Sequence, residues 1–598
     1  MTRVVALVAI VVAGTIAYGS LGSQLRGPSV FADELIYMDA TRSIADGHRP
    51  IERDRPYGRG LLFPAVGAPV FAAMSNDRKS YIALRWLNAL LFSLTAIPAY
   101  LLARRVLGVR WSVAVAAGSV AAPSALYTGM ILTESAAYLT GTIALYALAL
   151  ALERPTTRRQ LGALAAIVFG ALARPQLAAL VAAFPLGLGV RWMIAPPGAR
   201  PGRDALRRLW PSAVAFGAVA LLTVAAFASG RASLKDYQDV FTSYNPLAVL
   251  EWGWFTLGDL SLYLAFVPVV VAPIVVTYAW RRGRAGDRHD AAFVALLASA
   301  TFVTTLVVAA FSSAEFGFSR LHDRYLFYVV PLWLILTALW VERRLPPSRG
   351  EVVVGGVAAA ILVATLPPRL LVHDGSVQFD AVGTGVWSRI RDLDPARPSG
   401  LRLALALAAL GVAALVLAVA IASASRRSVV VLPILVVFIA NAAIVWKARI
   451  ADADVHVFSD NRAATWSWVD RAVPAGRSVT DVYVDSGPCL ERARDPFRWT
   501  EFFNGRIGPV LRLGLPAPPG VVTDGTNAHI AGSRIVRTSN GPVSPGYVVA
   551  PPGLTFAGTR IATGTIAQLQ LWRIDGKLRV LNAASNAQAI TVACPAGA

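Results

Sequence analysis

The sequence has few charged residues for its length. Only 15% of its 598 residues are Asp, Glu, Lys or Arg, whereas about 25% is usual in soluble globular proteins. An ordinary soluble enzyme is therefore not expected. Cysteine is also scarce, since Cys489 and Cys594 are the only two. So few cysteines exclude a disulfide-rich secreted scaffold.

In place of charge, the chain has hydrophobic residues, 56% of the total, gathered in long uncharged runs. A run of about 18 or more residues can cross a ~30 Å hydrocarbon core as a helix that satisfies its own backbone hydrogen bonds. Two short runs flank Arg174-Pro175, so we predict a polytopic α-helical membrane protein with roughly 11–13 transmembrane helices. The thirteen runs are residues 4–25, 86–103, 111–133, 135–152, 160–173, 175–190, 209–230, 260–280, 291–314, 325–341, 352–368, 403–425 and 428–446.

The basic residues indicate an orientation in the membrane. One set of alternate helix ends carries 21 Lys and Arg residues and six Asp and Glu residues, and such an excess is typical of cytoplasmic loops. The first run is predicted to be an uncleaved helix rather than a signal peptide, with a cytoplasmic N-terminus and an extracytoplasmic C-terminus. Loops that face anionic lipid account for most of the net charge of +21, so we expect membrane lipids and no nucleic acid as partners.

Two domains are predicted. Residues 1–447 form the transmembrane domain, with a first outer loop at 26–80 in which residues 61–74 are interfacial or re-entrant. Residues 448–598 lack a spanning run and form an extracytoplasmic, β-rich α+β domain. Within it, 461–473 is amphipathic, 479–484 alternates like a strand, and Asp575-Gly576 predicts a hairpin over 569–580. Cys489 and Cys594 form a disulfide or remain two unpaired thiols, and the sequence leaves both open.

An acid pair, Asp33-Glu34, follows the first helix just outside the membrane. A carboxylate in this place could accept the proton of an attacking hydroxyl group. The alternative is an ordinary hydrated acid pair. Arg59, in the same outer loop, is a further candidate site residue.

A second group of polar residues lies at the outer end of a later run. Arg320 and Arg324 could bind a phosphate bidentately, or the group could be an interfacial anchor with its tyrosines in the aromatic belt. Arg174, between two short runs, needs an anion or access to the interface. The neighbouring candidates are His322, Asp323, Tyr325 and Glu134.

The order of these motifs resembles the GT-C superfamily of integral-membrane glycosyltransferases, which includes protein O-mannosyltransferases, aminoarabinose transferases and actinobacterial arabinofuranosyltransferases. The similarity covers roughly residues 3–446. The Arg-rich, Lys-poor and Ala-rich composition suits a GC-rich bacterial genome, so a bacterial cytoplasmic membrane is the expected location. The similarity rests on five short motifs. They are Asp33-Glu34, the run 85–88 with Arg85 and Asn88, Thr133-Glu134-Ser135, Ala173-Arg174-Pro175 and Asp323-Arg324-Tyr325.

The resemblance implies an inverting transfer of a sugar from a polyprenyl-phosphate donor to a hydroxyl group of a glycan, lipid or protein. Asp33 would be the general base, and Glu34 would either assist it or orient the acceptor. Arg324, with Arg320, His322 or Arg174, would stabilise the leaving phosphate. A divalent cation is compatible with such a site, but nothing in the sequence requires one.

Two other functions remain open at this level. A transporter or flippase of lipid-linked glycans predicts ionisable residues within spans and internal repeats, and the sequence shows few of the former and no obvious repeat. A non-catalytic, glycan-binding membrane protein predicts that Asp33 and Arg324 are dispensable.

Overall fold

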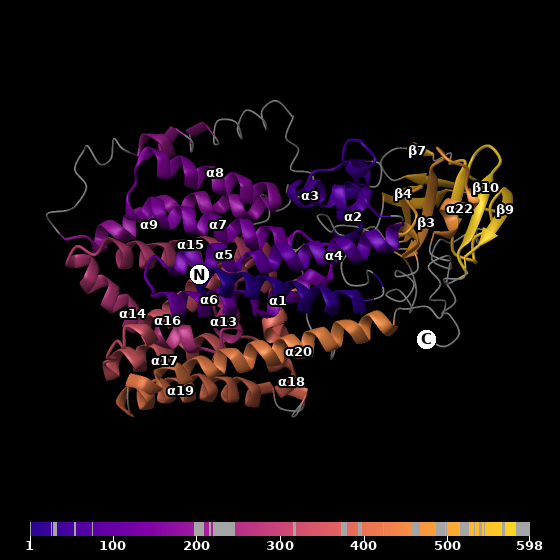
Figure 1. Cartoon of the computed structure of the whole chain (residues 1–598). Helices are drawn as coiled ribbons and strands as arrows, with labels where there is room; N and C mark the ends of the chain where they lie inside the picture. The colour runs from indigo at the N-terminus through magenta and orange to yellow at the C-terminus, as the bar shows by residue number, and fades with distance from the viewer. Residues whose placement is uncertain are drawn as a thin grey trace. The chain divides into compact units, whose positions relative to one another are not determined.

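Helices dominate the computed structural model, and strands gather near the C-terminus (Figure 1). Seven helices are long and apolar enough to cross a membrane among the described residues, or up to nine if each of two bent helix pairs is one span. The predicted fold class, a polytopic helical membrane protein with a C-terminal sheet, is confirmed. The description excludes residues 1, 26, 28–32, 53–54, 75, 197–208, 215–216, 219–244, 315–318, 372–378, 393–397, 423, 456–466, 486–496, 498, 515–525, 532, 538–540, 543–544, 565–567 and 582–598.

The chain divides into two compact units. Unit 1 contains residues 1–20, 88–129 and 133–448, and unit 2 contains residues 21–87, 130–132 and 449–598. Helices α1 (Thr2–Gln24), α4 (Asp77–Leu94) and α20 (Val431–Val455) have residues in both units. The predicted boundary at 447–448 stays a prediction of domain organisation.

Unit 1 is a bundle of helices. Helix α7 packs against α8 and α15, and α15 also packs against α9 (Figure 1). The α-helices confined to this unit are α5 (Ala96–Ala103), α6 (Val109–Val120), α7 (Glu134–Glu153), α8 (Thr157–Ala173), α9 (Leu180–Ile194), α13 (Pro246–Tyr263), α14 (Val267–Arg284), α15 (Arg288–Ser313), α16 (Val330–Glu342), α17 (Arg349–Ala364), α18 (Gly385–Asp392) and α19 (Pro398–Ala422).

Not every uncharged run is a straight span. Helices α8, α16 and α17 have only 17, 13 and 16 residues, and α8 ends just before Pro175, where a helix cannot easily continue. The run 260–280 is divided, because α13 and α14 meet at an angle of 102°. Ala265 and Phe266 take positive φ values of 52° and 64° at this bend. Most of the run 209–230 lies outside the described residues.

Short 3₁₀ segments lie between several of the helices. These segments are η1 (Pro123–Gly129), η2 (Pro175–Ala179), η5 (Asp323–Tyr325), η6 (Phe327–Val329), η7 (Pro368–Leu370), η8 (Val382–Thr384) and η9 (Ala424–Val430). Two of them, η2 and η5, carry or adjoin predicted site residues, so the candidate site is built on irregular backbone at helix ends.

Unit 2 joins the first loop to the C-terminal sheet. The loop contains α2 (Asp33–Ala45), α3 (Leu62–Ala72) and a short ribbon of β1 (Ile51–Glu52) and β2 (Arg55–Pro56). Arg42 of α2 links three segments, since its guanidinium lies 3.2 Å from Asp39 and 3.0 Å from Asp77 and donates to the Phe502 carbonyl at 2.8 Å.

The C-terminal sheet has eight strands in the order β7-β6-β5-β4-β3-β8-β10-β9. Strands β5, β4, β3 and β8 are parallel neighbours, and the outer strands pair antiparallel. Alternating residues face two cores; in β8, Val548 faces one and Val549 the other. The strands are β3 (Val479–Asp485), β4 (Ile507–Gly514), β5 (Thr526–Ala531), β6 (Arg534–Arg537), β7 (Gly541–Pro542), β8 (Tyr547–Ala550), β9 (Gly558–Thr563) and β10 (Gln570–Ile574).

The predicted strand over 479–484 is confirmed as β3, but the predicted hairpin over 569–580 is wrong. The turn exists, with Gly576 at φ 83°, but β10 pairs with β8 and β9 on its two edges. The returning segment instead forms single bridges, Arg579 with Arg534 and Val580 with Phe556. Of the predicted amphipathic helix 461–473, α22 (Trp468–Ala472) is described.

Candidate functional site

Asp33 is the first residue of α2 in unit 2. Its carboxylate accepts a 2.8 Å hydrogen bond from Arg59, and the two side chains are 19% and 20% exposed. Asp33 therefore remains within reach of solvent, while Arg59 holds it in one orientation. A carboxylate held in this way can serve as a proton acceptor.

Glu34, the next residue, is fully buried. Its Oε1 atom accepts from the Ile131 backbone N–H at 2.7 Å and from the Tyr81 hydroxyl at 3.2 Å. Arg85 lies over the Tyr81 ring, 3.6 Å from its centroid, and donates to the Gly22 and Leu25 carbonyls at 2.9 and 2.7 Å. These contacts tie α2 to α4 and to the end of α1.

The buried environment of Glu34 disfavours the charged form of its carboxyl group. Burial raises the pKa of Glu34 above its ordinary value, and the guanidiniums of Arg449 and Arg85 offset part of that shift. Arg449, also buried, donates to the Gly27 carbonyl at 3.2 Å. A side chain enclosed in this way holds backbone in place and has no access to a substrate.

Three arginines gather in unit 1 from two distant segments, and we call them the arginine cluster: Arg174, Arg320 and Arg324. Arg174 lies 2.6 Å from Glu134, the first residue of α7, and Arg324 lies 3.4 Å from the same oxygen. The side chains of Arg174 and Arg324 are each 6% exposed, whereas that of Arg320 is 29% exposed. Arg320 is thus the member most open to a ligand.

Asp380 holds the other side of the arginine cluster. Its carboxylate accepts from Arg320 at 3.0 Å and from Arg324 at 3.1 Å, and His322 lies 3.7 Å away. Burial alone would raise the pKa of Asp380, but the nearby His322 ring and the Arg324 charge lower it well below its ordinary value. Asp380 is therefore an anion that orients two cations.

Tyr325 packs against this assembly. The guanidinium carbons of Arg174 and Arg324 lie 4.4 and 4.8 Å from its ring centroid, and the His322 ring stacks on it at 5.6 Å. Cation–π contacts of this kind stabilise guanidinium groups away from water. The tyrosine thus helps to keep two buried arginines charged and aligned.

The carboxylate of Asp323 binds a backbone amide and a tyrosine hydroxyl. It accepts from the Gly383 backbone N–H at 2.5 Å and from the Tyr127 hydroxyl at 3.5 Å. Burial and the nearby carboxylate of Asp259 raise its pKa well above the ordinary value, which favours the neutral form. Asp323 positions the segment that carries Asp380, because Gly383 lies three residues further along.

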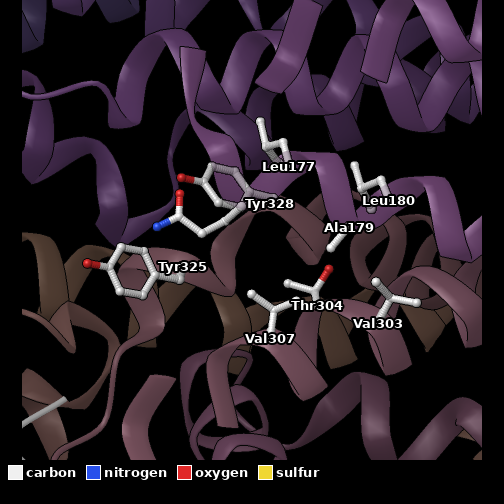
Figure 2. A pocket seen from close by; sticks show the side chains of 9 residues that line it. Leu177, Ala179, Leu180, Val303, Thr304, Val307, Tyr325 and Tyr328 are labelled. Carbon is white, nitrogen blue, oxygen red and sulfur yellow. The ribbon is translucent and has the colours of Figure 1, made fainter. Parts of the chain in front are cut away.

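A small cavity lies beside Tyr325, lined by η2 and α9 on one side and by α15 on the other (Figure 2). Its volume is about 20 Å³, which is room for roughly one water molecule. Leu177, Leu180, Val303 and Val307 give it an apolar wall next to Tyr325 and Tyr328.

The predicted site residues fall into two groups. Asp33, Glu34 and Arg59 belong to unit 2, whereas Glu134, Arg174 and residues 320–325 belong to unit 1. Cys489 and Cys594 lie outside the described residues. No group of three or more His, Cys, Asp or Glu side chains is placed to hold a metal ion in the described part of the chain.

Asp259, Asp380 and Arg449 were not among the predicted site residues. Asp380 lies in a loop with several other acids, and no local pattern distinguishes it. Asp259 lies directly before the predicted run that begins at residue 260, and its burial within α13 gave no signal in the sequence.

Residues 71–187 match the family model described as dolichyl-phosphate-mannose-protein mannosyltransferase. The matched segment contains Arg85, Glu134 and Arg174, and the match confirms, for this part of the chain, the predicted resemblance to a glycosyltransferase family. A search of curated protein sequences found no significant match.

Two solved proteins are similar in structure. The ArnT protein from Cupriavidus metallidurans, in the apo state and bound to undecaprenyl phosphate, has a TM-score of 0.48 and 15% identity over 94% of this chain and 97% of that chain. An oligosaccharyltransferase from Archaeoglobus fulgidus has a TM-score of 0.38 and 14% identity over 83% and 64%. Both scores lie below 0.5.

Proposed function

We propose that this protein is a membrane glycosyltransferase that moves a sugar from a polyprenyl-phosphate donor to a hydroxyl acceptor, with inversion. The observation that carries the proposal is the arginine cluster. Three arginines face two carboxylates, Glu134 and Asp380, so one positive charge remains for an anion. The match of residues 71–187 to a family named for a lipid-phosphate-linked sugar donor supports a phosphate as that anion.

In the proposed reaction Asp33 takes the proton of the acceptor hydroxyl as its oxygen attacks the anomeric carbon. The bond between that carbon and the phosphate oxygen breaks, and the polyprenyl phosphate leaves with an added negative charge. Arg320 and Arg324, held by Asp380, stabilise this charge in a site of low exposure, where such stabilisation is strongest. Glu34 is a positioning residue, because it is buried and bonded to the backbone of Ile131.

The apolar cavity beside Tyr325 supports the choice of a lipid-linked donor. Its leucine and valine wall adjoins the tyrosine that packs on Arg174 and Arg324. The first isoprenoid units would enter here beside their phosphate, once side chains move to enlarge a space of about 20 Å³.

Substitution of Asp33 tests the proposal. Membranes with the full chain are supplied with a panel of radiolabelled polyprenyl-phosphate sugars, and transfer to acceptor is measured. Asp33→Asn should lower transfer at least a hundredfold, since general-base catalysis contributes about 10²–10⁴-fold. Asp46→Asn, at an exposed position just beyond the same helix, is the matched control. Turnover by Asp33→Asn within a few-fold of wild type would remove Asp33 from the catalytic role.

A further inference from the structure

A second polar site lies in unit 1, away from the arginine cluster. Four arginines, a glutamate and a histidine line a pocket of about 410 Å³, which we call the basic pocket. Its residues come from three separate segments of the chain, namely the turn after α5, the junction of α7 and α8, and the start of α15. The residues are Arg105, Glu153, Arg154, Arg159, Arg288 and His289.

The basic pocket and the arginine cluster lie at opposite ends of the same helix. Glu134 is the first residue of α7 and Glu153 is the last. Twenty helical residues at about 1.5 Å each span roughly 30 Å, the thickness of a hydrocarbon core. Neighbouring α8 and α15 also begin near the basic pocket, and they end near Arg174 and His322. The two sites therefore face opposite sides of the membrane.

The single acid of the basic pocket already has partners. Glu153 is buried and binds Arg105 through both carboxylate oxygens, at 2.8 and 2.5 Å. His289 lies 3.0 Å from the same carboxylate and Arg159 lies 3.9 Å away. One negative charge is thus shared by several donors, and three arginine charges remain.

Two of the arginines have no such partner. The side chains of Arg154 and Arg288 are exposed and make no hydrogen bond or ion pair with any residue that the structure describes. Arg159 donates to the Leu150 carbonyl at 2.9 Å, which holds it at the rim. Like charges gathered round one pocket repel each other, and a bound anion would relieve that repulsion.

Ordinary cytoplasmic loops are also rich in arginine, but scattered loop charges need not converge. Here residues about 180 positions apart in the chain, Arg105 and Arg288, line one pocket. The pocket has the volume of a small-molecule site, and guanidinium groups match the oxygens of a phosphate bidentately. Basic pockets between membrane helices are places where anionic lipid headgroups bind.

We propose that the basic pocket binds a phosphoryl group on the membrane face opposite the arginine cluster. The group is either the headgroup of an anionic lipid or a free phosphate compound. In both cases Arg154, Arg159 and Arg288 contact the phosphoryl oxygens, while Glu153 and Arg105 hold the pocket in shape. This site is independent of the sugar-transfer reaction.

Binding to the purified full chain in detergent tests the proposal, with calorimetric titration of dihexanoyl phosphatidylglycerol and, separately, of inorganic phosphate. The double variant Arg154→Gln/Arg288→Gln should weaken binding at least tenfold. The matched control Arg281→Gln/Arg349→Gln removes the same charge from exposed positions of unit 1 outside the pocket and should change binding less than twofold. Tighter binding of the lipid identifies a headgroup as the source, and equal binding of phosphate identifies the free anion.

The Glu153→Gln variant tests the proposal in the opposite direction, because it should strengthen phosphate binding. It leaves hydrogen-bonding atoms in place but releases the charge of Arg105, so phosphate binding should strengthen severalfold. The proposal is overturned if neither probe binds below millimolar concentration, or if both double variants weaken binding equally, because the binding would then be a general effect of charge.

Discussion

At the scale of single residues, Arg320 is the member of the arginine cluster that we expect a donor phosphate to contact first. It is the most exposed of the three, and Asp380 keeps its partner Arg324 when Arg320 is replaced. Arg320→Gln should lower kcat/KM for the lipid-linked donor roughly 10- to 100-fold, since a hydrogen bond to a charged group contributes about 1.5–3 kcal/mol. Arg402→Gln, an exposed arginine at the start of α19, should leave it unchanged. Equal kinetics for both variants would exclude Arg320 from donor binding.

A second prediction at this scale concerns Asp380 and the pH dependence of folding stability. Its pKa in the folded protein is lowered, so its charge stabilises the fold above the ordinary Asp pKa of about 3.9 and this stability is lost as pH falls below that value. Asp380→Asn removes it at all pH values. Breaking a buried ion pair costs about 3–5 kcal/mol.

The variant should therefore unfold several degrees below wild type at pH 7, and the difference should begin to narrow below about pH 4 and close only as pH falls through the lowered pKa of the folded state. Thermal unfolding of both proteins in detergent across this range measures the difference, with Asp46→Asn as a control that changes little. If the difference in unfolding temperature between Asp380→Asn and wild type stays constant with pH, lost packing rather than lost charge causes the destabilisation.

At the scale of elements, α15 has two distinct faces. Val307 lines the cavity beside Tyr325, whereas its neighbour Leu306 is 45% exposed. Val307→Trp should fill the apolar space and lower kcat/KM for the lipid-linked donor at least tenfold. The added bulk should also lower the free energy of unfolding by about 1–3 kcal/mol, as overpacking of a core does. Leu306→Trp adds the same bulk on the outer face and should be active within twofold. If the two tryptophan variants behave alike, the prenyl chain enters elsewhere.

Elements also show where local sequence patterns fail. The run 260–280 is uniformly apolar, yet the chain turns by 102° within it. Hydrophobicity reports only that a segment avoids water, and a bent segment packed within a bundle avoids water equally well. The hairpin expected at Asp575-Gly576 fails for a similar reason, because β8 and β9 already occupy both edges of β10.

At the scale of the whole molecule, the orientation in the membrane is open to a direct test. The excess of arginine at one set of helix ends predicts that the loop after α14 is cytoplasmic and the C-terminal sheet is external. A reporter inserted after Arg284 should read cytoplasmic, and one inserted at the exposed Gly576 turn should read external. The reverse pattern would also reverse the faces assigned to the arginine cluster and the basic pocket.

The sequence by itself determined the class of the protein and named several residues of the candidate site. A membrane helix needs a continuous apolar run, and a polar group next to such a run needs a reason to be there, so both signals are local. Asp33, Glu134, Arg174 and Arg324 could be named on this basis.

Only the tertiary structure decided how these residues are partnered. Asp380 joins Arg320 and Arg324 from about 60 positions away, Glu34 bonds to Ile131, and three distant segments converge on the basic pocket. Such contacts depend on how distant segments pack, and no local pattern of charge or hydrophobicity encodes them. The separation of Glu34 from Asp33 is of the same kind, because adjacent acids became a buried anchor and an accessible carboxylate only when α2 packed.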